Sequence, residues 1–411
     1  MRWVDRWGGI PICFGLTLVR RAADLFASRR LEAGAPRQVL FLETAEMGSL
    51  VLAFPAVRHV QAAHPGCHVH VLVFAKLRDS VSAIGLAPDD RVLTIDASSL
   101  FTIARDTVRF ALEARRRRID TAVNLEMFAR LGAILCFLSG ARRRAGFHPF
   151  AQRGLYCGDL LTHRVVYNPH VHTSQAFLTL AMALDEPESD VPMGKFPLPT
   201  ARGVAPKVRA DPASRDRMLD RLARERPAVA GKRLIVVNPN ASQLIPIRRW
   251  PLGSFVALVR ALLADPMNAC VLTGSPDERA DARAVADAVN SDRVVDLSGK
   301  TSVRDLIDLY AAADLLVTND SGPAQIAAVT NIHILVLFGP ETPDLYRPLT
   351  DPERCTVMYS HYACSPCVSA FNQRNTACTE NRCLTTISAD TVHAAAAAIL
   401  QRRAGASTAA R

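Results

Sequence analysis

The clearest chemical signal in this chain is the segment Asp320-Ser-Gly-Pro323, which separates a predicted strand from a predicted helix. Either Asp320 or Ser321 can cap such a helix, and Pro323 suits its first turn. The backbone N–H groups that open a helix attract anions, and Gly322 allows a phosphate to approach the chain closely. The segment therefore fits a pyrophosphate site, although a well-capped helix without a ligand explains the same spacing.

A pair of arginines, Arg248 and Arg249, precedes Trp250 and Pro251 where another predicted helix begins. A guanidinium stays cationic at any useful pH and can hold a diphosphate with two parallel hydrogen bonds. Both arginines are therefore candidates for binding the phosphates of a ligand. The alternative is that both point to solvent while Trp250 packs.

The sequence Gly299-Lys-Thr301 matches the end of a Walker A loop but not its beginning, because Val294 stands where the pattern needs a glycine. The match to a P-loop therefore fails. Thr301 or Ser302 is instead predicted to cap the helix that follows.

Strands and helices alternate along both halves of the chain, which predicts parallel sheets with crossover helices. The strands expected in the first half cover 39–42, 69–74, 92–95 and 121–124, with a helix at about 50–63. Those expected in the second half cover 234–237, 269–272, 294–295, 315–318 and 332–338. Ligands of open α/β sheets bind beyond the carboxyl ends of the strands, where this chain places polar residues and glycine.

The length and composition fit a folded protein of two domains, with 411 residues of which 49% are hydrophobic and 21% charged. No apolar run reaches the ~20 residues that span a bilayer. A stretch rich in proline and charge in the middle of the chain predicts a linker. We expect an N-terminal arm (1–35), a first α/β domain (36–185), a linker (186–213), a second α/β domain (214–390) and a C-terminal helix and tail (391–411).

The formal net charge is +10, and only five of the 49 basic residues are lysine. Arginine binds phosphates in a forked geometry, so anionic partners are plausible. Nucleic acid is not favoured, because the runs Arg115–Arg118 and Arg142–Arg144 lack interleaved aromatic residues for base stacking. A solvated helix face and a loop explain these runs, and an anionic membrane surface or glycolipid explains the overall charge.

The first thirty residues combine arginines with apolar residues at three- and four-residue intervals, namely Trp3, Trp7, Ile10, Phe14 and Leu18. This pattern predicts either an amphipathic segment on a membrane surface or a hydrophobic arm packed on the protein itself. Pro11 is expected to interrupt any helix here. No small-residue cleavage site follows the apolar stretch, so it does not resemble a signal peptide, and we expect a cytoplasmic protein.

Taken in chain order, several short motifs resemble glycosyltransferase family 9, the ADP-heptose:lipopolysaccharide heptosyltransferases. They are Met47–Pro55, Pro239–Ser242, Arg248–Pro251, Thr273–Glu278, Leu297–Thr301, Asn319–Pro323 and Leu337–Pro340. The resemblance covers most of residues 36 to 400. It implies an α/β fold of the GT-B type, with two facing Rossmann-like domains that contain parallel sheets. The acceptor domain is then N-terminal and the nucleotide-sugar domain C-terminal.

The resemblance also implies an inverting, metal-independent transfer of heptose from ADP-heptose to lipopolysaccharide or another cell-surface glycan, without a cofactor. An acceptor hydroxyl attacks the anomeric carbon, a carboxylate takes its proton, and positive charge stabilises the departing phosphate. The expected partners are a nucleotide sugar and a lipid-linked or surface glycan. The expected location is the cytoplasm, with peripheral contact at the inner face of the cytoplasmic membrane.

The motifs and the resemblance together give the candidate nucleotide-sugar ligands, which are Ser242, Arg248, Arg249, Thr301, Asp320, Ser321, Gly322 and Gln325. Arg248 stands where the family usually has a phosphate-binding lysine, and Gln325 where it commonly has histidine. In the first loop the family's usual catalytic aspartate is replaced by Ser49. A serine hydroxyl cannot act as a carboxylate base, so Glu46 and Glu43 in the same turn are the candidate substitutes.

Four of the ten cysteines cluster near the C-terminus, at Cys364, Cys367, Cys378 and Cys383. This spacing fits a tetrahedral zinc site, and reduced, unligated thiols explain it as well. A disulfide is not expected in a cytoplasmic enzyme. Similar cysteine-bearing segments occur in some members of the family, which supports a structural role.

Two other functions stay open at this point. The replacement at Ser49 allows a non-catalytic relative that binds a nucleotide sugar or a glycan. A different enzyme of similar architecture, such as a nucleotide-sugar epimerase, is disfavoured by the series of Arg-Trp-Pro and Asp-Ser-Gly-Pro motifs.

Overall fold

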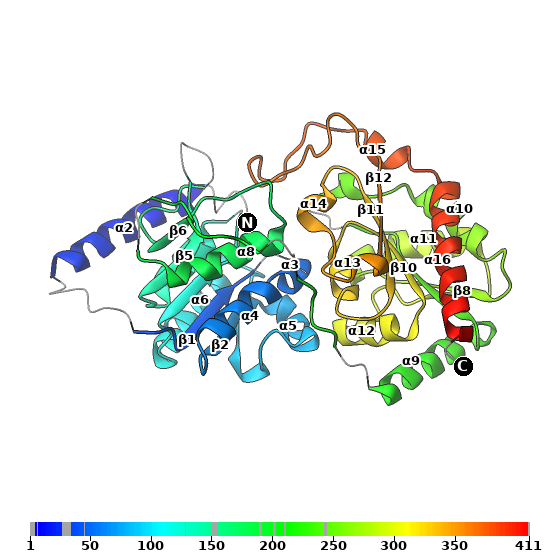
Figure 1. Ribbon diagram of the computed structural model, residues 1–411, viewed down its shortest axis with the longest axis horizontal. Helices are drawn as coiled ribbons and strands as arrows, with labels where there is room; N and C mark the ends of the chain where they lie inside the picture. Colours follow the sequence, from blue (N-terminus) through cyan, green and yellow to red (C-terminus); the bar gives the residue numbers. More distant parts are fainter. Residues whose placement is uncertain are drawn as a thin grey trace. The chain divides into compact units, whose positions relative to one another are not determined.

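The computed structural model describes residues 5, 7–26, 34–44, 46–127, 129–149, 155–188, 191–199, 203–208, 211–241 and 245–409. The chain divides into two compact units, Met1–Gly203 and Val204–Arg411 (Figure 1). Each unit contains a six-stranded sheet in which all neighbouring strands are parallel. The predicted architecture of two α/β halves with parallel sheets is therefore confirmed.

The sheet of unit 1 has the strand order β3-β2-β1-β4-β5-β6. Its strands are β1 (Gln38–Leu42), β2 (His68–Phe74), β3 (Val92–Ile95), β4 (Thr121–Asn124), β5 (Arg143–Phe147) and β6 (His163–Val165). The run Arg142–Arg144 was expected in a loop, but β5 includes its last two residues. The Arg144 side chain is buried. Its guanidinium donates to the carbonyl groups of Leu160 (2.6 Å) and Ala141 (2.5 Å), so these donors have partners within the protein.

The helices of unit 1 are α2 (Gly9–Phe26), α3 (Met47–Leu52), α4 (Phe54–Ala63), α5 (Arg78–Ile84), α6 (Leu100–Arg116), α7 (Leu131–Leu138) and α8 (Thr173–Met182). The single helix expected near 50–63 is divided at Ala53, because Pro55 fits only the first turn of α4. Helices α6 and α7 share a buried core with the sheet, and α2 packs against α7.

The expectation that Pro11 interrupts any N-terminal helix is wrong. Helix α2 runs from Gly9 to Phe26 with Pro11 in its first turn. The first N–H groups of a helix have no intrahelical partner, so proline costs little there. Trp3 of the predicted arm lies outside the described residues.

The sheet of unit 2 has the strand order β12-β11-β10-β7-β8-β9. Its strands are β7 (Arg233–Asn238), β8 (Asn268–Leu272), β9 (Val294–Asp296), β10 (Leu315–Asn319), β11 (His333–Phe338) and β12 (Cys355–Tyr359). Its helices are α9 (Pro212–Glu225), α10 (Leu252–Leu262), α11 (Arg279–Val289), α12 (Val303–Ala312), α13 (Gly322–Ala327), α14 (Pro343–Tyr346), α15 (Arg382–Thr385) and α16 (Ala389–Ala409). Figure 1 shows α10, α11 and α16 grouped beside this sheet.

Trp250 packs in the core of unit 2, as in the alternative expected for this segment, but Arg248 is buried and does not point to solvent as that alternative required. Its side chain is fully buried, and its ring meets Phe255 edge-on with 4.9 Å between centroids. Its indole N–H donates to the Ile387 carbonyl at 2.9 Å. Of the helices in the described part of the chain, none is long and apolar enough to cross a membrane.

Candidate active site

The carboxyl ends of the strands of unit 2 are joined by the side chain of Asn319, the last residue of β10. Its amide nitrogen donates to the carbonyl groups of Pro239 and Asn240, each at 3.1 Å, and its oxygen accepts from the Trp250 N–H at 3.0 Å. One buried amide therefore fixes the loop after β7 and the start of α10 against β10. The sequence analysis did not single out Asn319, although its place beside Asp320 at a strand end was an available signal.

A second set of contacts closes the loops after β7 and β8. The Asn238 amide donates to the Thr273 hydroxyl and the Asn240 amide to the Thr273 carbonyl, both at 3.3 Å. A Cβ atom on Gly274 would lie 2.6 Å from the Asn240 amide nitrogen. A side chain at position 274 would therefore displace the Asn240 amide from its present position.

Replacing Asn319 with alanine is expected to lower the free energy of unfolding by ~2–4 kcal/mol, because three buried backbone groups lose their partner. Urea unfolding of the purified protein measures this change. The matched control is Asn331→Ala, which removes an exposed amide from the same unit and should change stability by less than ~0.5 kcal/mol. Equal effects of the two substitutions would contradict the bridging role of Asn319.

Among the described candidate ligands, Arg248 is the cationic side chain that is buried. It ends a short 3₁₀ helix (Pro246–Arg248), and its Nη1 lies 3.6 Å from the Oδ2 atom of Asp320, which is also buried. Within the described ranges, its Nε has no hydrogen-bond partner. Buried guanidinium groups normally use all their donors, so Arg248 retains one donor for an anionic ligand, as does Arg249 through its buried Nη2 atom.

The other residues of the Asp320–Pro323 segment have defined positions. Ser321 occupies the N-cap position of α13, but its hydroxyl donates to the Asn319 carbonyl at 3.1 Å and makes no capping bond. The expectation that Ser321 caps this helix is therefore wrong, whereas Pro323 does lie in its first turn. Gln325 is buried on α13, and its amide donates to the Tyr346 carbonyl at 2.6 Å.

Gly322 is the first residue of α13. The other three candidates are placed differently from one another. The guanidinium of Arg249 contacts Asp281 of α11 at 3.0 Å and the Ala241 carbonyl at 3.2 Å, so it holds structural elements together. Thr301 is half-buried in the loop after β9, and Ser302 caps α12, as one of the two expected alternatives. Ser242 lies outside the described residues.

In unit 1 the first loop follows β1 and contains two of the candidate bases. Glu43 is buried, and its Oε1 accepts from the Glu46 N–H at 3.2 Å. Glu46 is more exposed and occupies the N-cap position of α3, whose first turn includes Ser49. Glu46 is therefore the more accessible to solvent of the two candidate bases in this loop.

A third carboxylate near this loop was not expected from the sequence. Glu126 follows β4 and is buried, and its Oε1 accepts from both the N–H and the hydroxyl of Thr44 at 2.5 Å. Parallel strands β1 and β4 are neighbours, so their carboxyl ends bring Thr44 and Glu126 together. These contacts give Glu126 a role in shaping the loop.

The comparison with known proteins identifies the family. Residues 110–377 match the family model of glycosyltransferase family 9 (heptosyltransferase), which is more than half of the chain. The chain belongs to glycosyltransferase family 9. The resemblance inferred from the motifs is therefore confirmed.

Individual family 9 proteins are similar over different lengths. Lipooligosaccharide heptosyltransferase 2 of Haemophilus influenzae is 24% identical over 326 residues, which cover 76% of this chain and 86% of that protein. Lipopolysaccharide heptosyltransferase 2 of Salmonella typhimurium is 31% identical over 144 residues, covering 34% of this chain and 39% of that protein. The solved structure of Escherichia coli ADP-heptose lipopolysaccharide heptosyltransferase II has a TM-score of 0.69 at 20% identity and covers 89% of this chain and 99% of its own. This likeness confirms the expected GT-B type of fold.

The cysteine cluster of this family 9 chain lines one small pocket of about 100 Å³ in unit 2, with all four thiols on its wall. Burial, together with the other three cysteines, raises the pKa of the Cys383 thiol to about 11. Within the described ranges, no three His, Cys, Asp or Glu side chains are grouped as ligands of a metal ion. The zinc site therefore stays a hypothesis without geometric support.

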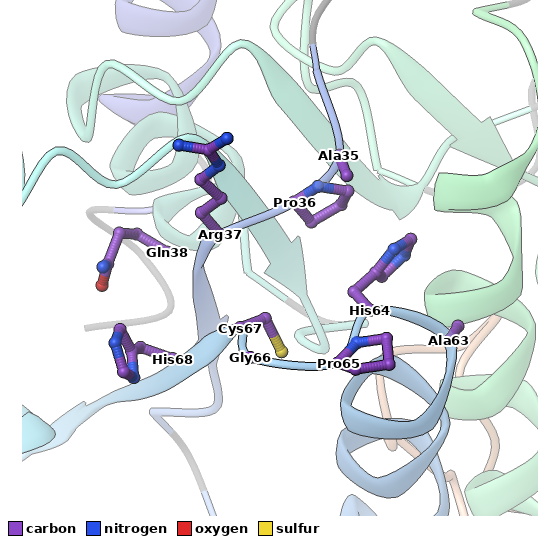
Figure 2. Close-up of a pocket in the computed structure, with 10 residues that line it drawn as sticks. All are labelled: Ala35, Pro36, Arg37, Gln38, Ala63, His64, Pro65, Gly66, Cys67 and His68. Atoms are coloured by element: carbon purple, nitrogen blue, oxygen red, sulfur yellow. The ribbon is translucent and has the colours of Figure 1, made fainter.

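A pocket of about 370 Å³ lies in unit 1, at the beginning of strands β1 and β2. Figure 2 shows its wall, formed by the segments Ala35–Gln38 and Ala63–His68. Gln38 and His68 pair at the beginning of β1 and β2, so this pocket is at the amino ends of the strands. Ligands of open α/β sheets bind at the carboxyl ends, and we therefore assign no substrate to it.

Proposed function

We propose that this family 9 glycosyltransferase transfers heptose from ADP-heptose to a lipopolysaccharide or another cell-surface glycan. The observation that carries the proposal is the buried Arg248 at the carboxyl edge of unit 2, within a chain whose family is that of the heptosyltransferases. The relative from Escherichia coli is described as an ADP-heptose lipopolysaccharide heptosyltransferase. No cofactor or metal takes part in the proposed reaction.

The proposed mechanism gives a separate role to each of the following side chains. Glu46 takes the proton of the acceptor hydroxyl as that oxygen attacks the anomeric carbon from the face opposite the nucleotide. Arg248 binds the diphosphate and stabilises the negative charge that develops as it leaves. Arg249 is assigned no contact with the diphosphate, because its guanidinium contacts Asp281 and the Ala241 carbonyl.

The donor can be identified by calorimetric titration of the purified protein with ADP, UDP and GDP. We expect ADP to bind most tightly, because the leaving nucleotide of ADP-heptose is ADP. Preference for UDP or GDP would keep the transferase and change the donor.

Transfer itself is measured by incubating the protein with ADP-heptose and lipopolysaccharide that lacks its outer heptose. Appearance of heptosylated product supports the proposal. ADP binding without product on any glycan acceptor would instead favour a relative that binds a nucleotide sugar and does not transfer it.

A further inference from the structure

Helix α2 presents an unusual surface, because its outward face is apolar along its length. The exposed side chains are Ile10, Ile12, Phe14, Leu18, Val19 and Leu25, and Phe14 alone is 56% exposed. A helix on a protein surface normally points its apolar side inward and its polar side to water. An exposed apolar patch of this size marks an interaction site.

The inward face of α2 is fixed to unit 1, so the helix cannot turn over to bury the apolar face. Cys13 and Thr17 are buried, and the Thr17 hydroxyl donates to the Cys13 carbonyl and accepts from the Asp159 N–H. Arg20 forms an ion pair of 2.6 Å with Asp159. The Arg130 guanidinium pairs with Asp5 at 3.2 Å, just before the helix.

Helix α6 adds a second exposed apolar stripe to the same side of the sheet. Phe101, Val108 and Leu112 are exposed, with Phe101 at 75%. Helix α7 contacts both α6 and α2, and it shares one buried cluster with α6 and another with α2. The three helices therefore form one layer, and both of its outer members expose apolar side chains.

The charge exposed on this layer is positive. The side chains of Arg21, Arg109 and Arg116 are 70%, 75% and 76% exposed. Their acidic partners are much less exposed, as with Asp106 and Asp159. Over residues 1–30 the sequence has six arginines and two aspartates, a net charge of +4.

We propose that the outer face of α2 and α6 docks on the surface of an anionic phospholipid bilayer. Apolar side chains enter the boundary between headgroups and acyl chains, and the surrounding arginines bind lipid phosphates. A second copy of this chain is a poorer occupant, because a two-fold interface would bring the same positive faces together. The inference goes beyond the proposed function, since it does not depend on the sugar transferred.

The test is sedimentation of the full-length protein with vesicles of phosphatidylethanolamine and phosphatidylglycerol, compared with vesicles of phosphatidylcholine. We expect binding to the anionic vesicles that weakens with added salt. Two double substitutions, Phe14→Gln with Leu18→Gln and Phe101→Gln with Leu112→Gln, should each weaken binding by at least ~10-fold. These side chains are exposed, so unfolding midpoints should not change.

The matched control is Met267→Gln, which removes an exposed apolar side chain from unit 2 and should leave vesicle binding unchanged. Undiminished binding in both double variants would overturn the proposal. So would dimerisation of the wild type that the α2 variant abolishes while neither protein binds vesicles. The vesicles contain no glycan acceptor and the readout is not transfer, so this result is separate from the outcome for the proposed function.

Discussion

Replacing Glu46 with glutamine is expected to lower kcat for sugar transfer by ~10²–10⁴-fold while the affinity for ADP stays unchanged. Glutamine keeps the size and the hydrogen-bonding capacity of the side chain but cannot accept a proton from the acceptor hydroxyl. The substitution at position 46 removes neither Arg248 nor the Asp320 carboxylate with which Arg248 pairs. Steady-state kinetics together with ADP calorimetry separates these two effects.

A rescue experiment makes the assignment of Glu46 sharper. Ser49 lies in the first turn of α3, three residues after Glu46, and the resemblance places it where the family usually has its catalytic aspartate. If Glu46 replaces that aspartate, adding Ser49→Asp to the Glu46→Gln variant should recover part of the lost kcat. Unchanged turnover in Glu46→Gln alone would remove Glu46 as the base and leave the transferase assignment standing.

The matched control for Glu46 is Glu43→Gln in the same loop. Glu43 is buried and accepts from the backbone N–H of Glu46, so its loss should reduce stability and disturb the loop. A change in the unfolding midpoint is therefore expected with Glu43→Gln and not with Glu46→Gln. If kcat and the unfolding midpoint fall together in both variants, the loss of activity has a structural cause.

The parallel sheets were predictable because their central strands are buried on both faces and read as apolar runs. Strand β7 is buried at every position after the first, and β10 and β11 along their whole length. Two of the edge strands, β6 and β12, gave no such signal. In β12 only Cys355 is buried, and β6 has three residues, so neither produces a recognisable apolar run.

The sequence predicted which motifs contribute to the candidate site, but not the contacts that their side chains make. The sequence indicated both arginines of the pair, but it could not show which one is buried and which one pairs with another helix. That difference arises from long-range contacts, because Arg249 meets Asp281 on α11 while Arg248 is buried beside Asp320. Asn319 and Glu126 were missed for the same reason, since their partners lie on other loops of the sheet.

Replacing Arg248 with alanine is expected to weaken ADP binding by ~10–100-fold, because a charged hydrogen bond to the diphosphate is lost. The Nε atom of Arg248 is buried and, within the described ranges, has no partner in the protein. A diphosphate oxygen supplies that partner and neutralises the guanidinium in a site where charge is poorly solvated. Calorimetric titration with ADP measures the change directly.

Two further substitutions separate loss of the phosphate contact from loss of structure. Arg248→Lys keeps the charge and introduces the residue that the family usually has here, so it should bind ADP more tightly than Arg248→Ala. Arg249→Ala breaks the partly exposed pair with Asp281, which is worth ~1 kcal/mol or less, and should change ADP affinity little. If Arg249→Ala weakens ADP binding as much as Arg248→Ala does, the pair acts together on the ligand. Binding of the donor would then change the contacts that distinguish the two arginines. The burial of Arg248 would no longer single it out as the phosphate ligand.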